Sequence, residues 1–201
     1  MKYVKMLGLL AVAAAALMAF AGSASATELT GPAGKLGVGS VIKATSTNSK
    51  LTGSVEVACK HSSVEGKITN AGGAGVTVEG SIEKTKLTFT ECNGDTVEVL
   101  NGGTLIVHTQ NPENNGNGIV TSTGAEVTIQ LHRIVLGFPV TTHCIYVTNA
   151  TDIGHLTGGT PAVLDINSSP IPRKATDGAC GESSIWTGNY TVTSPTTLIV
   201  H

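Results

Sequence analysis

The sequence predicts an all-β fold, an antiparallel β-sandwich or barrel-like sheet of about a dozen short strands, stapled by disulfides and preceded by a helical signal peptide. Three observations predict it. Short segments rich in Val, Thr and Ile alternate apolar and polar residues with a period of two. Glycine-rich turn sequences separate these segments. Cysteines lie only after an export signal, in the part of the chain that would reach an oxidising compartment.

The N-terminal segment, residues 1–26, has the composition of a secretory signal peptide. Lys2 and Lys5 precede the apolar run 6–20, and the small residues 24–26 form a signal-peptidase site. The apolar run is about 15 residues long, shorter than the roughly 20 that a membrane-spanning helix needs. We therefore expect cleavage after Ala26, a secreted or extracellular protein, and no membrane association after cleavage. An uncleaved membrane anchor is the alternative.

The remaining residues 27–201 have the length of one domain and predict a single β-sandwich domain without an internal linker. The formal net charge is −2, and loss of Lys2 and Lys5 makes it −4. Charged residues form only 13% of the chain and no run of Lys or Arg occurs. Because phosphate binding needs clustered basic residues, nucleic acid is excluded as a partner. The oligomeric state is not predicted.

The strands follow from the alternation of residue types. In segment 51–59, Leu51, Val55 and Val57 share one parity and polar side chains take the other, which predicts one buried and one wet face. The same reasoning gives strands at 38–45, 51–59, 64–69, 75–80, 82–92, 96–100, 104–109, 118–122, 126–131, 144–148, 162–166, 185–192 and 197–200.

Turns and loops are predicted between these strands. Asn-Gly and Gly-Gly sequences at 70–73, 93–95, 101–103 and 158–159 supply the positive φ of tight turns. Segment 111–118 is predicted as the tip of a long hairpin. Segment 168–174 is predicted as a loop, because Pro170 and Pro172 cannot donate to a β-ladder.

The four cysteines are Cys59, Cys92, Cys144 and Cys180. An even number in an exported chain predicts disulfides, and four cysteines allow three pairings. We favour Cys59 with Cys92 and Cys144 with Cys180, because each pair joins neighbouring strands and the two loops do not cross. A zinc site is disfavoured, since the short C-x-x-C spacing is missing from the sequence.

No catalytic, cofactor-binding or metal-binding residue can be assigned from the sequence. The six histidines never show the spacings that build metal sites, and the G-x-S-x-G nucleophile sequence does not occur. A Ser-His-Asp arrangement can still be assembled from distant strands. A small-sugar platform at Trp186 and Tyr190, which share one strand face, would require exposed and coplanar rings. Both rings filling the core is the structural alternative.

A resemblance to a known group of proteins rests on short stretches spread over nearly the whole mature chain. They are 59–62 (CKHS), 65–67 (EGK), 87–92 (LTFTEC), 102–105 (GGTL), 122–127 (STGAEV), 151–159 (TDIGHLTGG), 186–190 (WTGNY) and 193–195 (TSP). With them the chain resembles uncharacterised exported β-rich proteins of soil actinobacteria. The resemblance implies export, β architecture and paired cysteines. That group has no assigned activity, so no functional residue follows from it.

The expected function is a secreted or envelope-associated structural, adhesive or binding module. Threonine-rich wet faces, low charge and disulfides suit persistence outside the cell, and the expected partner is the cell envelope or an extracellular polymer. A secreted hydrolase with a site assembled between strands is the alternative, and a small-sugar-binding module is a weaker one. We lean against an enzyme.

Overall fold

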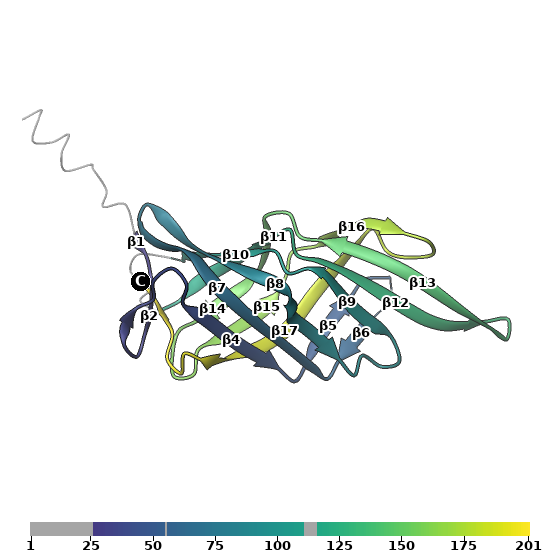
Figure 1. The fold of residues 1–201 in the computed structure, drawn as a ribbon. Coiled ribbons are helices and arrows are strands. Elements are labelled where there is room, and N and C mark those ends of the chain that lie inside the picture. The colour runs from purple at the N-terminus through teal and green to yellow at the C-terminus, as the bar shows by residue number, and fades with distance from the viewer. Residues whose placement is uncertain (1–25, 55, 111–115) are drawn as a thin grey trace, which may run out of the picture.

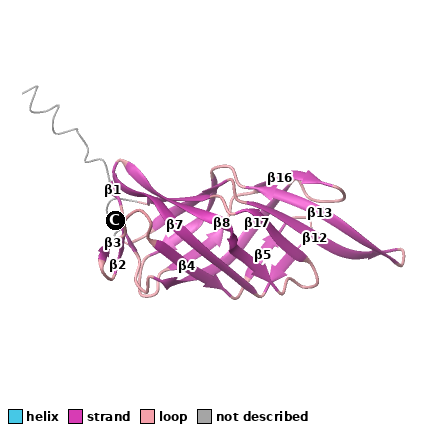
Figure 2. Cartoon of the chain, viewed as in Figure 1, coloured by secondary structure: helices cyan, strands magenta, loops and turns pink. Residues whose placement is uncertain are grey.

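The computed structural model describes residues 26–54, 56–110 and 116–201, and these residues contain strands, turns and loops but no helix (Figure 2). The prediction of an all-β, antiparallel, barrel-like fold is confirmed. The signal-peptide prediction falls on residues outside the described part, except for Ala26. In the segments described, no helix is long and apolar enough to cross a membrane.

Eight strands pair in a ring and form a barrel-like sheet (Figure 1). All the pairings are antiparallel, and the pairing of the last strand with the first closes the ring. The strands in spatial order are β4 (Val41–Ser46), β7 (His61–Ala74), β8 (Val76–Thr90), β10 (Thr104–Thr109), β11 (Gly118–Thr123), β14 (Thr151–Thr157), β15 (Val163–Asn167) and β17 (Ser183–Ser194).

A second sheet branches from the N-terminal half of β17. There β17 pairs with β5 (Ser49–Thr52) and β16 (Ile171–Thr176), whereas its C-terminal half pairs with β4. Beyond β16 the sheet continues through β13 (Phe138–Val147) and β12 (Glu126–Val135) to β9 (Thr96–Asn101). Beyond β5 it ends at β6 (Glu56–Cys59). One strand, β17, therefore belongs to both halves of the molecule.

Short strands lie at one end of the barrel, where Figure 1 also places the C-terminus. The β1 strand (Ala26–Thr27) pairs with β7, and β2 (Leu29–Gly31) lies between β3 (Gly34–Lys35) and β18 (Ile199–Val200). Leu29, Leu198 and Val200 are buried in the same apolar cluster as the inward-facing barrel residues. These strands therefore cover the apolar interior at that end.

Two main apolar cores correspond to the two halves. The first lies inside the barrel and contains Val78, Val120 and Leu164, and the second lies under the branched sheet and contains Val57, Ile129 and Tyr146. Trp186 packs against both cores. Because this residue lies on β17, the shared strand also joins the two cores through its side chain.

Both predicted disulfides are present. Cys59, the last residue of β6, is bonded to Cys92 between β8 and β9, and Cys144 on β13 is bonded to Cys180 between β16 and β17. Cys144 is fully buried, and the described residues include no free cysteine. Two disulfides in the core indicate that the chain folds in an oxidising compartment.

Three sequence predictions were wrong in detail. The single strand predicted at 51–59 is the hairpin β5–β6, with Val55 outside the described part. The predicted loop 168–174 contains the start of β16. The pairing of β16 with β13 begins at Arg173, one residue after Pro172. The missing N–H of Pro172 therefore removes no hydrogen bond between these two strands. The strand β14 was not predicted, because the bulge at Ile153 and Gly154 places the buried Ile153 and Leu156 three positions apart.

Candidate functional site

The β12–β13 hairpin projects from the body of the molecule (Figure 1). The β12 strand pairs with β9 only as far as Gln130, and β13 pairs with β16 only from Cys144 onward. The two strands continue to pair with each other up to Val135 and Phe138. Residues 131–143 thus form a two-stranded ribbon beyond the edge of the sheet.

The turn of this ribbon consists of Leu136 and Gly137, which have φ angles of 52° and 85°. Two successive residues with positive φ match the tight hairpin turns that Asn-Gly and Gly-Gly sequences favour. Leucine is disfavoured there, because its Cβ collides with the backbone in the left-handed region. Leu136 is also 94% exposed, so burial does not stabilise it. Neither the turn nor the core accounts for a leucine at this position.

Large apolar side chains cover the end of the ribbon. Ile134 is 79% exposed and Phe138 72% exposed. The segment 134–140 holds five of the nine large apolar side chains that are exposed among the described residues. We call Ile134, Val135, Leu136, Phe138 and Val140 the apolar tip. Isolated exposed apolar residues are ordinary, whereas a contiguous group marks an interaction surface.

The apolar tip covers both faces of the ribbon. Val135 lies directly opposite Phe138, and Ile134 lies opposite Pro139. Because neighbouring residues of a strand point to opposite faces, these two pairs occupy the two sides of the ribbon. The turn residue Leu136 extends the apolar surface over the end. The tip therefore presents apolar groups in every direction except back toward the body.

Two aspartates hold the ribbon where it leaves the body. On one strand, the Asp95 carboxylate accepts hydrogen bonds from the Arg133 guanidinium at 2.7 and 3.1 Å and from the His132 backbone N–H at 3.0 Å. On the other strand, the Asp177 carboxylate accepts a bond of 2.6 Å from the backbone N–H of His143 and lies 2.7 Å from its ring Nδ1. Both strands are therefore fixed just behind the tip.

The Asp95 carboxylate is adapted to this position. Its side chain is only 3% exposed. Burial alone would raise the pKa of Asp95, but the hydrogen bonds from Arg133 and the His132 backbone outweigh this effect and hold the pKa below its ordinary value. For Asp177, the hydrogen bonds from the backbone and ring of His143 likewise lower the pKa. Both groups are carboxylates at neutral pH.

A polar depression of about 180 Å³ lies on the outer face of the barrel, on β4, β7, β8 and β17. Glu65 lies at its centre, 3.0 Å from the ammonium groups of both Lys43 and Lys86, and these contacts lower the pKa of Glu65. Several hydroxyl groups surround it. A hydroxyl nucleophile needs a base of raised proton affinity, and a carboxylate held between two ammonium groups has the opposite property. The depression therefore gives no support to the hydrolase alternative.

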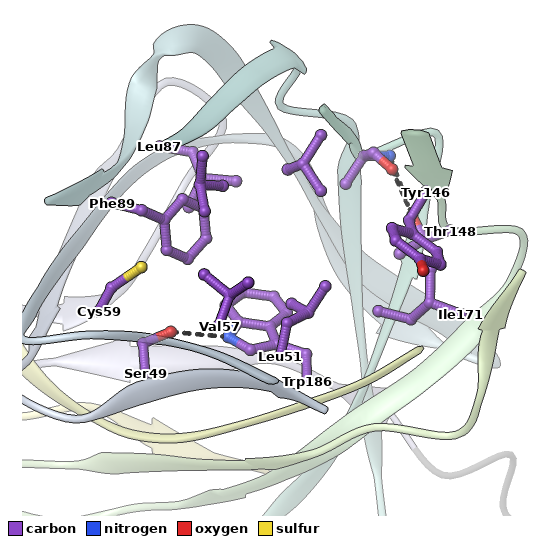
Figure 3. A pocket seen from close by; sticks show the side chains of 13 residues that line it. Ser49, Leu51, Val57, Cys59, Leu87, Phe89, Tyr146, Thr148, Ile171 and Trp186 are labelled. Carbon is purple, nitrogen blue, oxygen red and sulfur yellow. Dashed lines mark hydrogen bonds between the residues drawn. The ribbon is translucent and has the colours of Figure 1, made fainter. Parts of the chain in front are cut away.

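The interior cavities are small and apolar. One of about 100 Å³ lies inside the barrel among Leu29, Val107 and Leu156, and one of about 40 Å³ lies in the second core among Val57, Phe89 and Trp186 (Figure 3). Ligand pockets usually measure about 300–1,000 Å³ and contain converging polar groups. Neither cavity has these properties, so both are packing voids of the cores.

Trp186 and Tyr190 do not form a sugar platform. Tyr190 is 0% exposed, and its ring meets that of Trp186 edge to face, with an interplanar angle of 85° and centroids 5.7 Å apart. The Trp186 Nε1–H donates to the Ser49 hydroxyl at 3.0 Å, a bond drawn in Figure 3. The arrangement that a platform requires, exposed and coplanar rings, is not present. The two rings pack in the core instead.

The comparisons with known proteins add no assignment. No protein-family model, curated protein or solved structure matched the chain. Across the part of the chain that the structure covers, no group of three or more His, Cys, Asp or Glu side chains is placed to hold a metal ion. Among the described residues, the apolar tip is therefore the feature that bears most directly on function.

Sequence reasoning missed the apolar tip altogether. Residues 132–143 lay between two predicted strands and were not assigned. A signal was available in segment 134–140, where apolar residues occupy successive positions of both parities around a Leu-Gly pair. A half-buried strand would show apolar residues at every second position. Such a segment is also typical of a fully buried strand, and the cue to a turn was the single glycine, Gly137, at its centre.

Proposed function

We propose that this protein is an exported binding or adhesive module that attaches to its partner through the apolar tip of the β12–β13 hairpin. The observation that carries the proposal is Leu136, a leucine 94% exposed in a left-handed turn position. Selection for folding alone favours asparagine or glycine there. A residue that folding disfavours at an exposed site is expected to serve an interaction.

The rest of the molecule supports this role. Export is supported by the N-terminal sequence and by the two disulfides, which suit an oxidising compartment. The small apolar cavities and the buried aromatic rings fit a scaffold whose interior is filled. The two aspartate anchors hold the projecting ribbon rigidly, so that the tip is presented without a large loss of conformational entropy on binding.

The test compares the wild type with the double variant Leu136→Asn/Phe138→Asn in the organism that exports it. A matched control, Val38→Asn/Val76→Asn, removes two exposed apolar side chains that lie outside the tip. We expect the wild type and the control to remain with the envelope fraction and the tip variant to pass into the medium. Equal partitioning of all three proteins would refute attachment through the tip.

A further inference from the structure

The apolar tip could meet a groove on a protein, a second copy of this chain or a lipid surface. From the geometry of the ribbon we infer that its partner is the interfacial zone of a lipid bilayer. This inference rests on the proposed function and specifies the partner of the same site. Three features of the ribbon carry it: the distribution of apolar groups around it, the depth of its apolar part, and the chemistry of the residues behind it.

The distribution of apolar groups fits a partner that surrounds the ribbon. A protein groove or sheet edge that receives a strand contacts one face of it and one backbone edge. Here Val135 and Phe138 lie on one face, Ile134 on the other, and Leu136 over the end. Docking against a flat apolar surface would leave one of these faces in water. A fluid apolar medium covers all of them at once.

The depth of the apolar part fits a shallow insertion. At 3.3–3.4 Å per residue, the two steps from Ile134 to the turn residue Leu136 extend about 7 Å. Segments that lie in the membrane interface bury their apolar groups to about 5–10 Å, whereas a spanning strand needs about 9–11 residues. The outer backbone edges of the ribbon are also unpaired by neighbouring strands beyond Gln130 and Cys144. Such groups need water or headgroups, which the bilayer centre does not provide.

The residues behind the tip fit the headgroup layer. His132, Arg133 and Thr141 are exposed and lie immediately next to the apolar segment. No Asp or Glu occurs between residues 127 and 151. The two carboxylates at the base of the ribbon, Asp95 and Asp177, are paired with Arg133 and His143. This proposal departs from the expectation of no membrane association after signal cleavage, which concerned spanning and anchoring segments.

The experiment uses the oxidised mature chain, residues 27–201, with vesicles of phosphatidylcholine alone and of phosphatidylcholine mixed with phosphatidylglycerol. Trp186 is the only tryptophan and is partly buried between the two cores. A second tryptophan at the tip, Phe138→Trp, then reports insertion through the difference between spectra with and without vesicles. Val38→Trp, at an exposed position outside the tip, is the matched control.

We expect a blue shift for Phe138→Trp with both vesicle types, and quenching when the acyl chains carry bromine. Val38→Trp should show neither effect. In co-sedimentation, Leu136→Asn/Phe138→Asn should weaken vesicle binding by about tenfold or more for each side chain removed, the loss that burial of such groups implies. Val38→Asn/Val76→Asn should bind like the wild type.

Several results would overturn the lipid inference. They are failure of the wild type to bind either vesicle, binding that the tip substitutions leave unchanged, and a tip-dependent dimer in sedimentation without lipid, which would assign the tip to a second copy. The envelope-retention assay separates the two proposals. If retention in the envelope depends on the tip but the protein does not bind vesicles, the proposed function holds with a partner other than lipid. If the tip substitutions change neither retention nor vesicle binding, both proposals are wrong.

Discussion

Cys59 and Cys92 form a disulfide between the two ends of the second sheet. Cys59 is the last residue of β6, which pairs only with β5, and Cys92 precedes β9, which pairs only with β12. Both sulfur-bearing side chains are buried in the second core. The bond continues the register of β7 and β8, where His61 pairs with Thr90 and the Lys60 backbone N–H donates to the Glu91 carbonyl at 3.2 Å. It therefore ties the end of β6 covalently to the segment that leads into β9.

Removal of this disulfide should destabilise the protein substantially. For Cys59→Ala/Cys92→Ala we expect the free energy of unfolding to fall by about 3–4 kcal/mol, the chain-entropy value for a loop of this length. Urea unfolding followed by circular dichroism measures the change. The pair Cys144→Ala/Cys180→Ala, which opens a loop of nearly equal length, is the comparison. A loss below 1 kcal/mol for the first pair would show that the β6 and β9 ends do not need the bond.

Asp95 should contribute stability that depends on pH. Because its pKa is lowered in the folded state, the contribution is present above the unfolded value of about 3.9 and is lost as the pH falls through the folded pKa. Asp95→Asn is expected to lower the free energy of unfolding by about 1.5–3 kcal/mol at neutral pH, the range for hydrogen bonds to charged groups.

The measurement for Asp95 is denaturant unfolding at neutral pH and at a series of acidic values. The difference between wild type and variant should shrink below about pH 4, since Asp95 then binds a proton in the unfolded state, whereas in the folded state its lowered pKa delays protonation to a more acidic pH. Glu28→Gln, which breaks the exposed pair with Lys35, should change the stability by at most about 0.5 kcal/mol. A constant difference across the whole pH range would argue against the ionised Asp95 as the anchor.

Leu136→Asn should stabilise the fold while weakening attachment. Asparagine tolerates positive φ better than leucine, so the free energy of unfolding is expected to rise by about 0.5–1 kcal/mol. Thermal unfolding checks the stability, and co-sedimentation with vesicles checks the binding. Val38→Asn should alter neither quantity by more than experimental error. A destabilised Leu136→Asn would mean that the leucine contributes to folding, which would remove the main support for an interaction at the turn.

Gly154 should not accept a side chain. Its φ is 146°, and a Cβ atom there would lie 2.0 Å from the backbone oxygen of Asp165 on the neighbouring strand. Gly154→Ala therefore requires β14 and β15 to separate, and we expect a loss of about 1–3 kcal/mol or more in the free energy of unfolding. Gly37→Ala, where the new methyl group meets nothing within 4 Å, is the control. Equal stabilities in a urea titration would contradict the tight approach of these strands.

The strands whose one face is buried could be predicted from the sequence, because burial of alternate residues leaves a period of two. The segment 104–109 was predicted with the bounds that β10 has. The β5–β6 hairpin was mistaken for one strand, because Leu51 and Val57 are directly paired across it and so keep the same parity. Ring closure could not be predicted either. It depends on β17 meeting β4, strands about 140 residues apart, and alternation within a strand carries no information about its neighbour.

The candidate site was harder to predict than the fold, since it breaks the rule that revealed the strands. In segment 134–140 the residues of both strand faces are apolar. Their side chains are exposed because β12 and β13 extend beyond the ends of their neighbours β9 and β16. Sequence patterns predict the ends of a single strand poorly, and they predict even less well how far one strand extends beyond the strand paired with it. Trp186 and Tyr190 drew attention because rings on one strand face can be exposed, and only the packing of two cores showed that they are not.

The position of β17 near the C-terminus decides when this protein can become folded. Neither the barrel nor the second sheet is complete until residues 183–194 are available, because both recruit this one strand. During synthesis, which proceeds from the N-terminus, earlier hairpins can form but have no closed interior in which to bury their apolar faces. The closed barrel and the second sheet therefore cannot be completed before residues 183–194 are available, however early the other strands are made.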